Sequence, residues 1–527
     1  MIEDFNGFPD GSTITTDFCI VGAGAAGITI AREFLGTRSR VLVLEAGGAG
    51  SEAATQKLYD SEVVGLPHNG IHEGRARVFG GTTTLWGGQA LRFGDLDFQK
   101  RSWVPHSGWP ISRAELDPYY ERAERVMHLG SRFTYEQLCE SFGVEPPAFD
   151  SAKLYMACSQ WSPKPNFGTA YRHELKSAHN VSVLLHANVT AIALNQGGTA
   201  IENIEFRTLA GKKGTAKARF YVVCCGGIET ARLLLASDGI ERQGVGNRQD
   251  LVGRYFQEHF HMTYGEVLTT NRGHLQALFE SFFPGGLKQA PLIVLAQHVQ
   301  VERQLLDIHG TVIFEPAPDS SIAAAKTLFR ALIGRDFSDA GELSRLAWTA
   351  LAGPREMFSL AYRLYVQKRA GTPKRGAILL GAQGEMAPNP DSRVMLGEAR
   401  DALGMRRVAL DWRLGEIERR TACEYIRTLA SEFERLGLGF FDLKQVASLD
   451  DPAEWVHRAH DSAHHMGTTR MHESPQFGVV DSNCQVHGIS NLYIGSSSVF
   501  PTCARSNPTL TILALCLRIA DRLKQMA

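Results

Sequence analysis

The sequence predicts an α/β fold, α+β overall: a Rossmann-type domain with a parallel sheet, discontinuous in the chain, with a second domain inserted into it. Three separate strand–turn–helix patterns support the sheet, one near each end of the chain and one in the middle. The stretch at about 262–455 differs, with long amphipathic segments such as 415–436 and alternating runs such as 378–381. A length of 527 residues leaves room for two or three folding units.

The first pattern begins with an apolar strand at residues 17–21, DFCIV. A glycine turn and a helical segment at 25–35 follow, and a second strand at 41–44 ends before Glu45. Strand, helix and strand in this order and at these lengths predict a parallel βαβ unit.

The turn of this unit reads Gly22-Ala23-Gly24-Ala25-Ala26-Gly27, a GxGxxG motif. Its first glycine permits the tight turn, its second lets a diphosphate approach the backbone, and its third lets the helix pack on the strand. The helix N-terminus offers free N–H groups to phosphate. Glu45, about twenty residues on, can accept hydrogen bonds from a ribose. The motif predicts a bound dinucleotide but does not distinguish NAD from FAD.

The other two patterns lie far along the chain. In the middle, a strand at 220–223 precedes a Gly226-Gly227 turn and a helix at 229–237. Near the end, a strand at 492–494, a loop at 495–501 and a helix at 508–523 follow one another, with proline in the first turn of the helix. We therefore expect all three segments in one sheet.

Composition narrows the class of protein. Hydrophobic residues make up 44% and charged residues 21%, as in ordinary globular proteins. With a net charge of −1, we expect no field that attracts nucleic acid or an anionic membrane. No apolar segment has the roughly 20 residues of a membrane span, and the N-terminus does not resemble a secretory signal. The nine cysteines form no CxxC pair, which favours core thiols and a reducing, cytoplasmic location.

Five sequence blocks, which include the three patterns above, follow one another over nearly the whole chain. They read VGAGAAGITIAREF…VLVLEAGG, RVFGGTTTLWGG at 77–88, YVVCCGGIETARLLLAS with DLVGRYFQEH at 250–259, EMAPNPDSRVML at 385–396, and HHMGTTRM at 464–471 with NLYIGSSSVFPTCARSNPTLTI at 491–512. In order and spacing they resemble the glucose–methanol–choline (GMC) flavoprotein oxidoreductases. The last pair is most similar to the pyranose oxidase and sugar dehydrogenase branch.

The resemblance implies an FAD-dependent oxidation of an alcohol and a two-domain fold. A Rossmann-type FAD-binding domain would comprise residues 1–115, 170–261 and 456–527. A substrate-binding domain, built on an antiparallel sheet with helices, would comprise 116–169 and 262–455 together with lid segments. The expected reaction converts a CH–OH group of a sugar, sugar derivative or polyol to a carbonyl, by hydride transfer to flavin N5.

The same blocks place the residues expected at FAD. In some relatives the GGTTTLWGG loop carries a histidine bonded covalently to the flavin. Leu85 stands at that position here and has no nucleophilic atom, so we predict non-covalent FAD. The full set expected at the cofactor is Gly22, Gly24, Ala25, Ala26, Gly27, Glu45, Ala46, Arg77, Gly80, Gly81, Thr82, Thr84, Leu85, Trp86, Gly87, Gly88, Val189, Cys225, Gly226, Gly227, Gly495, Ser496, Asn507, Pro508 and Thr509.

Oxidation of an alcohol also requires a base for the hydroxyl proton, and histidine has a suitable pKa. The family's HxxGT segment implies that this base is His464, with Asn507 as its partner before the final helix. An amide there can hydrogen-bond the substrate oxygen. His465 is the rival base, and we expect all three residues in the substrate site.

Several alternatives stay open. His457, His460 and His464 are spaced to share a helix face and could bind zinc, but a solvated face is the plainer interpretation, and we predict no metal site. The protein could instead oxidise a non-sugar alcohol, act as a non-redox lyase that retains FAD, or be a nucleotide-binding sensor. The electron acceptor could be oxygen, a quinone or a separate redox protein, since no CxxCH haem motif is present.

Overall fold

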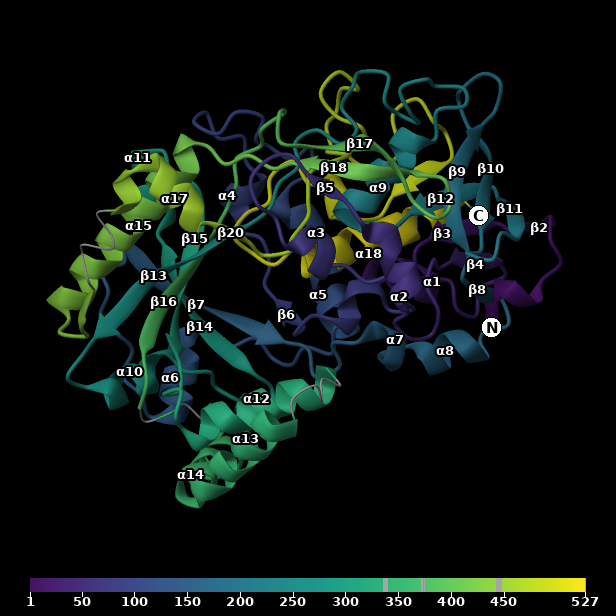
Figure 1. The fold of residues 1–527 in the computed structure, drawn as a ribbon. Helices are drawn as coiled ribbons and strands as arrows, with labels where there is room; N and C mark the ends of the chain where they lie inside the picture. The colour runs from purple at the N-terminus through teal and green to yellow at the C-terminus, as the bar shows by residue number, and fades with distance from the viewer. Residues whose placement is uncertain (335–339, 371–372, 374, 442–447, 527) are drawn as a thin grey trace.

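The computed structural model describes residues 1–334, 340–370, 373, 375–441 and 448–526. Figure 1 shows one body that contains both termini, beside a second body formed mainly by the middle of the chain. Each body has a hydrophobic core of its own.

The first body is built on a six-stranded sheet in which every pair of strands is parallel. Its strands come from the start, the middle and the end of the chain, which confirms the predicted α/β fold class. Val21 pairs with Leu44 and Val223, so the turns that follow these strands lie at one edge of the sheet. In spatial order the strands are β1 (Ile2–Asp4), β8 (Val181–Leu185), β4 (Val41–Leu44), β3 (Phe18–Val21), β12 (Phe220–Val223) and β21 (Leu492–Ile494).

Three helices pack around this sheet, and they begin close to its carboxyl edge. They are α1 (Ala25–Glu33), α9 (Gly226–Ala236) and α18 (Thr509–Met526), and α18 packs on both α1 and α5 (Arg113–Val126). A Cβ atom on Gly27 would lie 1.9 Å from the carbonyl oxygen of Gly22. Only glycine therefore allows α1 to pack this closely on its own turn, as the third glycine of the motif predicts.

The second body is built on an eight-stranded sheet whose pairs are all antiparallel. The helix α15 (Glu416–Arg435) covers it, and the Tyr425 hydroxyl donates to the carbonyl of Ile293, 2.8 Å away. Its strands are β6 (Gln89–Ala90), β7 (Leu154–Trp161), β14 (Gln289–Leu295), β15 (Ile308–Phe314), β16 (Ile378–Gly384), β13 (Phe260–Leu268), β19 (Phe440–Phe441) and β20 (His460–Asp461).

Two small sheets complete the fold. One joins β2 (Ser12–Thr15), β11 (Lys213–Lys217), β10 (Ile201–Arg207) and β9 (Asn188–Leu194). The other joins β17 (Arg393–Arg400), β18 (Arg406–Asp411) and β5 (Glu62–Val63). Val394 and Leu410 of this second sheet lie in the core of the first body, beside α9. The domain boundaries inferred from the sequence stay a prediction.

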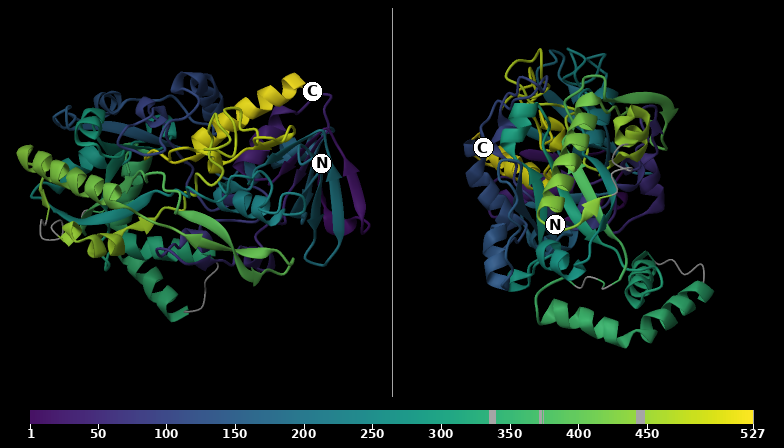
Figure 2. Two further views of the ribbon diagram at one scale, coloured as in Figure 1. Left: turned by 90° about the horizontal axis from the view of Figure 1, so that it is seen from above. Right: turned by 90° about the vertical axis from the view of Figure 1, so that its left-hand side faces the viewer.

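Further helices connect the strands of the four sheets (Figure 2). In the described ranges, no helix combines the length and apolar character that a bilayer crossing needs. These helices are α2 (Ala53–Gln56), α3 (Gly70–Glu73), α4 (Asp95–Phe98), α6 (Tyr135–Phe142), α7 (Phe167–Ala170), α8 (Arg172–Ser177), α10 (Arg272–Phe279), α11 (Gln297–Arg303), α12 (Ser321–Gly334), α13 (Ala340–Ala352), α14 (Pro354–Tyr365) and α17 (Pro452–Arg458).

Candidate active site

A cavity of about 480 Å³ opens at the carboxyl edge of the parallel sheet. The N-termini of α1, α9 and α18 all line it. The residues that precede α1 and α9 make no side-chain cap, so backbone N–H groups stay available there. Helix N-termini carry partial positive charge. Because three of them meet at this cavity, it favours a ligand with phosphate groups.

The glycine turn lines this cavity with backbone atoms alone. Gly22 has a φ of 101°, and a Cβ atom there would lie 2.7 Å from the carbonyl oxygen of Cys224. A Cβ on Gly81 would lie 2.8 Å from the Cα of Gly24. Side chains are excluded at these positions, so a diphosphate can approach the backbone closely. The residues present therefore fit a dinucleotide cofactor.

Glu45 ties this turn to the end of β4. One carboxylate oxygen accepts the N–H of Ala23 and the other accepts that of Gly47, each at 2.8 Å. Burial raises the pKa of Glu45 to about 7, although these backbone N–H groups and Arg77 oppose the rise. Because Glu45 also lines the cavity, its other lone pairs are available to a ribose hydroxyl.

Arg77, expected at FAD, belongs to a buried ion cluster beside the cavity. Arg77 and Arg75 contact separate oxygens of Glu229, at 2.6 and 2.8 Å. Burial would raise the pKa of Glu229, but Arg232, Arg77 and Arg75 together lower it to about 2. Glu229 therefore stays ionised and holds Arg77 at the cavity wall.

Most of the residues expected at FAD line the cavity. The lining residues from that set are Gly22, Gly24, Ala25, Ala26, Glu45, Ala46, Arg77, Gly81, Thr82, Leu85, Trp86, Val189, Cys225, Gly226, Gly227, Ser496, Asn507, Pro508 and Thr509. Sequence reasoning did not find other lining residues, among them Tyr59, Met405 and Ser497. Tyr59 and Met405 fall outside the glycine-rich blocks and had no local signal, whereas Ser497 lies within the block at 491–512, beside the predicted Ser496.

Six expected residues do not line the cavity: Gly27, Gly80, Thr84, Gly87, Gly88 and Gly495. Several of these glycines serve close packing instead. A Cβ atom on Gly495 would lie 3.0 Å from the sulfur of Cys224, and one on Gly80 would lie 2.7 Å from the backbone nitrogen of Gly168. At these two positions a side chain would collide with neighbouring residues of the protein, so a ligand is not needed to explain the glycine.

The two residues expected to be catalytic meet at the cavity. The Nε2 atom of His464 lies 3.3 Å from the Nδ2 atom of Asn507, and both residues line the wall. His464 follows β20, and Asn507 lies two residues before α18. The distance between their side chains is that of a hydrogen bond.

A third residue, His259, determines which nitrogen of His464 carries the proton. His259 Nε2 lies 3.1 Å from the carbonyl oxygen of Cys503, which can only accept, so this nitrogen is protonated. The Nδ1 atom of neutral His259 is then an acceptor, and it lies 2.9 Å from His464 Nδ1. His464 therefore donates from Nδ1, and its unprotonated Nε2 accepts from the Asn507 amide.

Both imidazoles are neutral near pH 7. Burial, with a smaller contribution from His259, lowers the pKa of His464 well below its usual value. Burial likewise lowers the pKa of His259 to about 4, against an opposing effect of the hydrogen bond to Cys503. A neutral His464 with its lone pair in the cavity can accept a proton.

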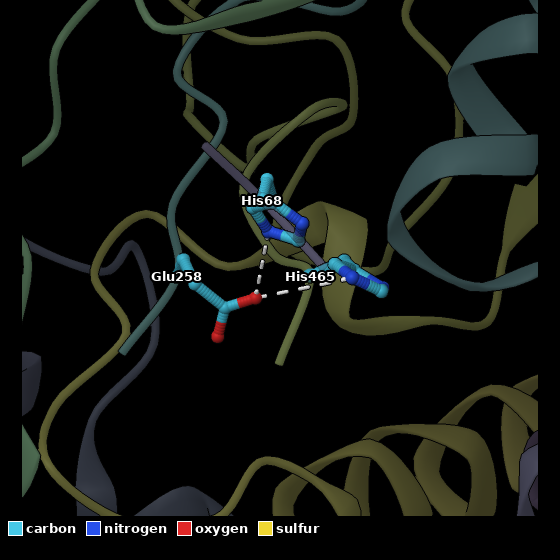
Figure 3. Close-up of side chains that lie close together, drawn as sticks. All are labelled: His68, Glu258 and His465. Carbon is cyan, nitrogen blue, oxygen red and sulfur yellow. Dashed lines mark ion pairs between the residues drawn. The ribbon is translucent and has the colours of Figure 1, made fainter. Parts of the chain in front are cut away.

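A buried carboxylate, Glu258, holds the backbone of both histidines. It accepts the N–H of His464 at 2.7 Å and that of His259 at 2.8 Å. Figure 3 shows the same carboxylate to one side of the rings of His68 and His465, whose Nε2 atoms lie 3.3 and 3.9 Å from one of its oxygens. Sequence reasoning gave Glu258 and His259 no role, although both lie in the FQEH block.

This cluster is the one group in the described ranges with three close metal-binding side chains, all within 4.8 Å of one another. However, His68 Nδ1 already accepts the N–H of Ile71, 3.1 Å away, so the proton of neutral His68 is on Nε2. That nitrogen has no lone pair for a metal and instead points its N–H toward Glu258. Among the described residues, His68 Nε2 and His465 Nε2 have no hydrogen-bond partner, and the proton on His68 Nε2 disfavours a metal.

The alternative zinc site differs from the expectation, whereas His465, the rival base, lies at the cavity as expected. Helix α17 ends at Arg458, and His460 lies in β20, so His457, His460 and His464 do not share a helix face, solvated or otherwise. His465 also lines the cavity, but its ring packs near His68 and Phe256. The rings of His464 and His465 thus have separate partners.

A row of polar side chains crosses the antiparallel sheet near the catalytic pair. The Gln383 amide donates to the carbonyl of Arg505, 2.9 Å away and two residues from Asn507. His309 and His261 lie directly opposite Gln383 on the two neighbouring strands. Residues opposite one another in antiparallel strands share a face, so all three side chains point to the Arg505 loop. The sequence contained no signal for this row, because the row depends on how β16 is aligned with β13 and β15.

Comparisons with known proteins show which families, relatives and folds the chain is similar to. Residues 388–516 match the protein family described as "GMC oxidoreductase", and residues 17–256 match that described as "FAD dependent oxidoreductase". The chain is 25% identical to 6'''-hydroxyparomomycin C oxidase of Streptomyces lividus, over 95% of this chain and 90% of that protein. It is 24% identical to 2-methyl-1,2-propanediol dehydrogenase of Mycolicibacterium austroafricanum, over 96% and 94%. Its fold is similar to that of pyridoxine 4-oxidase from Mesorbium loti, with a TM-score of 0.56, 16% identity and coverage of 97% and 99%.

Proposed function

We propose that this chain, which belongs to the GMC flavoprotein oxidoreductases and uses FAD, oxidises a CH–OH group of a sugar, a sugar derivative or a polyol to a carbonyl. The observation that carries the proposal is the unprotonated Nε2 of His464, which lies 3.3 Å from the Asn507 amide on the wall of the FAD cavity. FAD, when bound, supplies the acceptor for the hydride.

His464 and Asn507 have complementary roles in this proposal. A substrate hydroxyl placed between them would give its proton to His464 Nε2 and accept a hydrogen bond from the Asn507 amide. The Nδ1 contact with His259 keeps the imidazole in the tautomer that can accept this proton. His465 would contribute to the wall of the site rather than to proton transfer.

A polar substrate is supported by two observations. The row of His261, Gln383 and His309 offers hydrogen-bonding groups on the sheet face near the catalytic loop. Of these groups, the buried Nδ1 of His309 has no hydrogen-bond partner among the described residues, and such a group suits a substrate with several hydroxyls better than a purely apolar alcohol. The names of the two relatives above likewise describe an oxidase and a dehydrogenase of hydroxyl-bearing molecules.

We also propose that FAD is held without a covalent bond, because Leu85 at the cavity wall offers no nucleophile. The nine cysteines are all free thiols, which supports a reducing, cytoplasmic location. Oxygen, a quinone and a separate redox protein are the acceptors to compare in reoxidation assays.

Anaerobic flavin bleaching tests the proposal. Sugars, glycosides and polyols are mixed in turn with the FAD-loaded protein, and the flavin absorbance is followed. At least one polyhydroxylated substrate should bleach the flavin, and His464→Ala should slow bleaching by roughly 10² to 10⁴-fold, the usual contribution of a general base. His460→Ala, on the neighbouring exposed strand, is the matched control.

Two results would overturn the proposal. A flavin that stays yellow with every alcohol while a substrate is cleaved would identify the non-redox lyase. Bleaching by His464→Ala at nearly the native rate would show that another group takes the proton.

A further inference from the structure

Three helices, α12, α13 and α14, form an arm between strands β15 and β16 of the antiparallel sheet. Figures 1 and 2 show that the arm projects away from both bodies. Within it, α12 packs on α13 and, over a smaller area, on α14. No part of the proposed oxidation uses this arm.

The root of the arm is fixed to the second body. Arg363, near the end of α14, and Arg369, just beyond it, both contact the carboxylate of Glu280. The guanidinium of Arg369 also lies 3.7 Å from the centre of the Phe282 ring. Buried ion pairs and cation–π contacts of this kind hold the arm in a defined direction.

The outer surface of the arm is apolar and aromatic. On α14, Phe358, Tyr362 and Tyr365 follow one another at i, i+4 and i+7, and their exposed fractions are 73%, 47% and 71%. On α13, Trp348 and Leu351 are 72% and 74% exposed. No residue of α14 is buried. Large apolar side chains gathered in this way mark an interaction surface rather than a random surface composition.

The arm also carries an excess of basic residues. Residues 321–370 include eight Lys and Arg against four Asp and Glu, in a chain whose net charge is −1, and two of these arginines, Arg363 and Arg369, are paired with Glu280. Lys326, Arg345 and Arg355 are exposed on its three helices. The overall charge therefore conceals a local field, and the expectation of no attraction to an anionic membrane does not apply to this segment.

We propose that the arm, residues 321–370, is a membrane-surface anchor that lies in the headgroup region of an anionic bilayer. Exposed Trp, Phe, Tyr and Leu beside Lys and Arg on short amphipathic helices are typical of interfacial binding without a membrane span. The basic residues would be drawn to anionic headgroups, while the aromatic rings would enter the acyl boundary. Pairing with a second copy is disfavoured, since two such basic surfaces repel each other.

Vesicle sedimentation of the FAD-loaded full chain tests the proposal. The protein should sediment with vesicles of phosphatidylcholine and phosphatidylglycerol, and much less with phosphatidylcholine alone. Raising the salt concentration should release it, because exposed charges are screened. Equal sedimentation with both vesicle types, or none with either, would overturn the proposal.

Variants locate the contact. Trp348→Glu, Phe358→Glu and Tyr365→Glu together should lower partitioning onto anionic vesicles at least about tenfold. These side chains are exposed and glutamate favours helices, so the flavin spectrum should be unchanged. Phe477→Glu, at a residue 54% exposed outside the arm, is the control and should bind as the native chain does.

A second variant, with Lys326, Arg345 and Arg355 each changed to Glu, should lose the preference for anionic vesicles. Light scattering without lipid tests whether a second copy of the chain covers the arm instead. A native dimer that becomes a monomer in the aromatic triple variant would show that a second copy covers the surface, and would overturn the proposal. Unchanged vesicle binding by both arm variants would overturn it too.

Discussion

At the scale of single residues, the site depends on the direction of three hydrogen bonds. Cys503 offers only a carbonyl, so His259 must donate to it, His464 must donate to His259, and Asn507 must donate to His464. A backbone carbonyl thereby determines which nitrogen of His464 carries the proton. Such an arrangement needs no charged partner, which fits the lowered pKa of both histidines.

His259 is therefore a positioning residue, and its replacement tests the order of donors. His259→Phe should slow flavin reduction about tenfold, the worth of one hydrogen bond, because either tautomer of His464 then becomes accessible. His259→Asn places an amide oxygen near the former Nδ1 position and should restore part of the rate. Equal rates for the Phe and Asn variants, measured by stopped-flow reduction, would contradict the tautomer argument.

The lowered pKa of His464 predicts how the rate responds to pH. A base works only when it is unprotonated, and a lowered pKa means that protonation begins below the usual histidine value of about 6.5. The value of kcat/KM should therefore be flat near neutrality and fall only in more acidic solution. A profile for FAD-loaded protein that already falls between pH 8 and 7 would contradict this assignment.

At the scale of elements, the sequence predicted what depends on local pattern. Strands at 41–44, 220–223 and 492–494 agree with β4, β12 and β21, because each is a short, largely buried run of apolar residues with polar or glycine residues close by on both sides. Bounds of helices moved by a few residues, as they do when packing decides the last turn. Contacts such as that between Glu258 and His68 join segments 190 residues apart, and nothing local in either segment indicates the other.

The polar row on β13, β16 and β15 predicts that a substitution in the antiparallel sheet will weaken substrate binding. Gln383→Leu removes the amide that bonds the Arg505 carbonyl, while leaving the strand and the catalytic pair in place. We expect KM for a polyhydroxylated substrate to rise about tenfold or more, since a lost hydrogen bond leaves polar groups without partners, and kcat to change less. Gln476→Leu, at an exposed loop residue, is the control. An unchanged KM would remove the row from the substrate site.

At the scale of the whole molecule, the chain crosses between its two cores several times. The parallel sheet provides the cavity and the antiparallel sheet faces the catalytic loop, while residues 502–507 contact both. Thr502, for example, bonds the backbone of Asp97, and Gln383 bonds that of Arg505. The site exists only where distant segments meet, so sequence reasoning could place its residues by family resemblance but could not derive their contacts.

The same dependence on the folded whole predicts how FAD leaves. Three helix N-termini and the glycine turn line the cavity, and Leu85 on its wall has no atom that could bond the flavin. Denaturation by acid or detergent should therefore release all flavin into the supernatant, where its fluorescence can be measured after the protein is precipitated. Because FAD binds only the folded chain, a hundredfold excess over its Kd should stabilise the protein by about 2.7 kcal/mol and raise Tm. Flavin that remains with washed precipitate would identify a covalent bond, and peptide mapping would then have to find its donor among the other residues of the cavity wall.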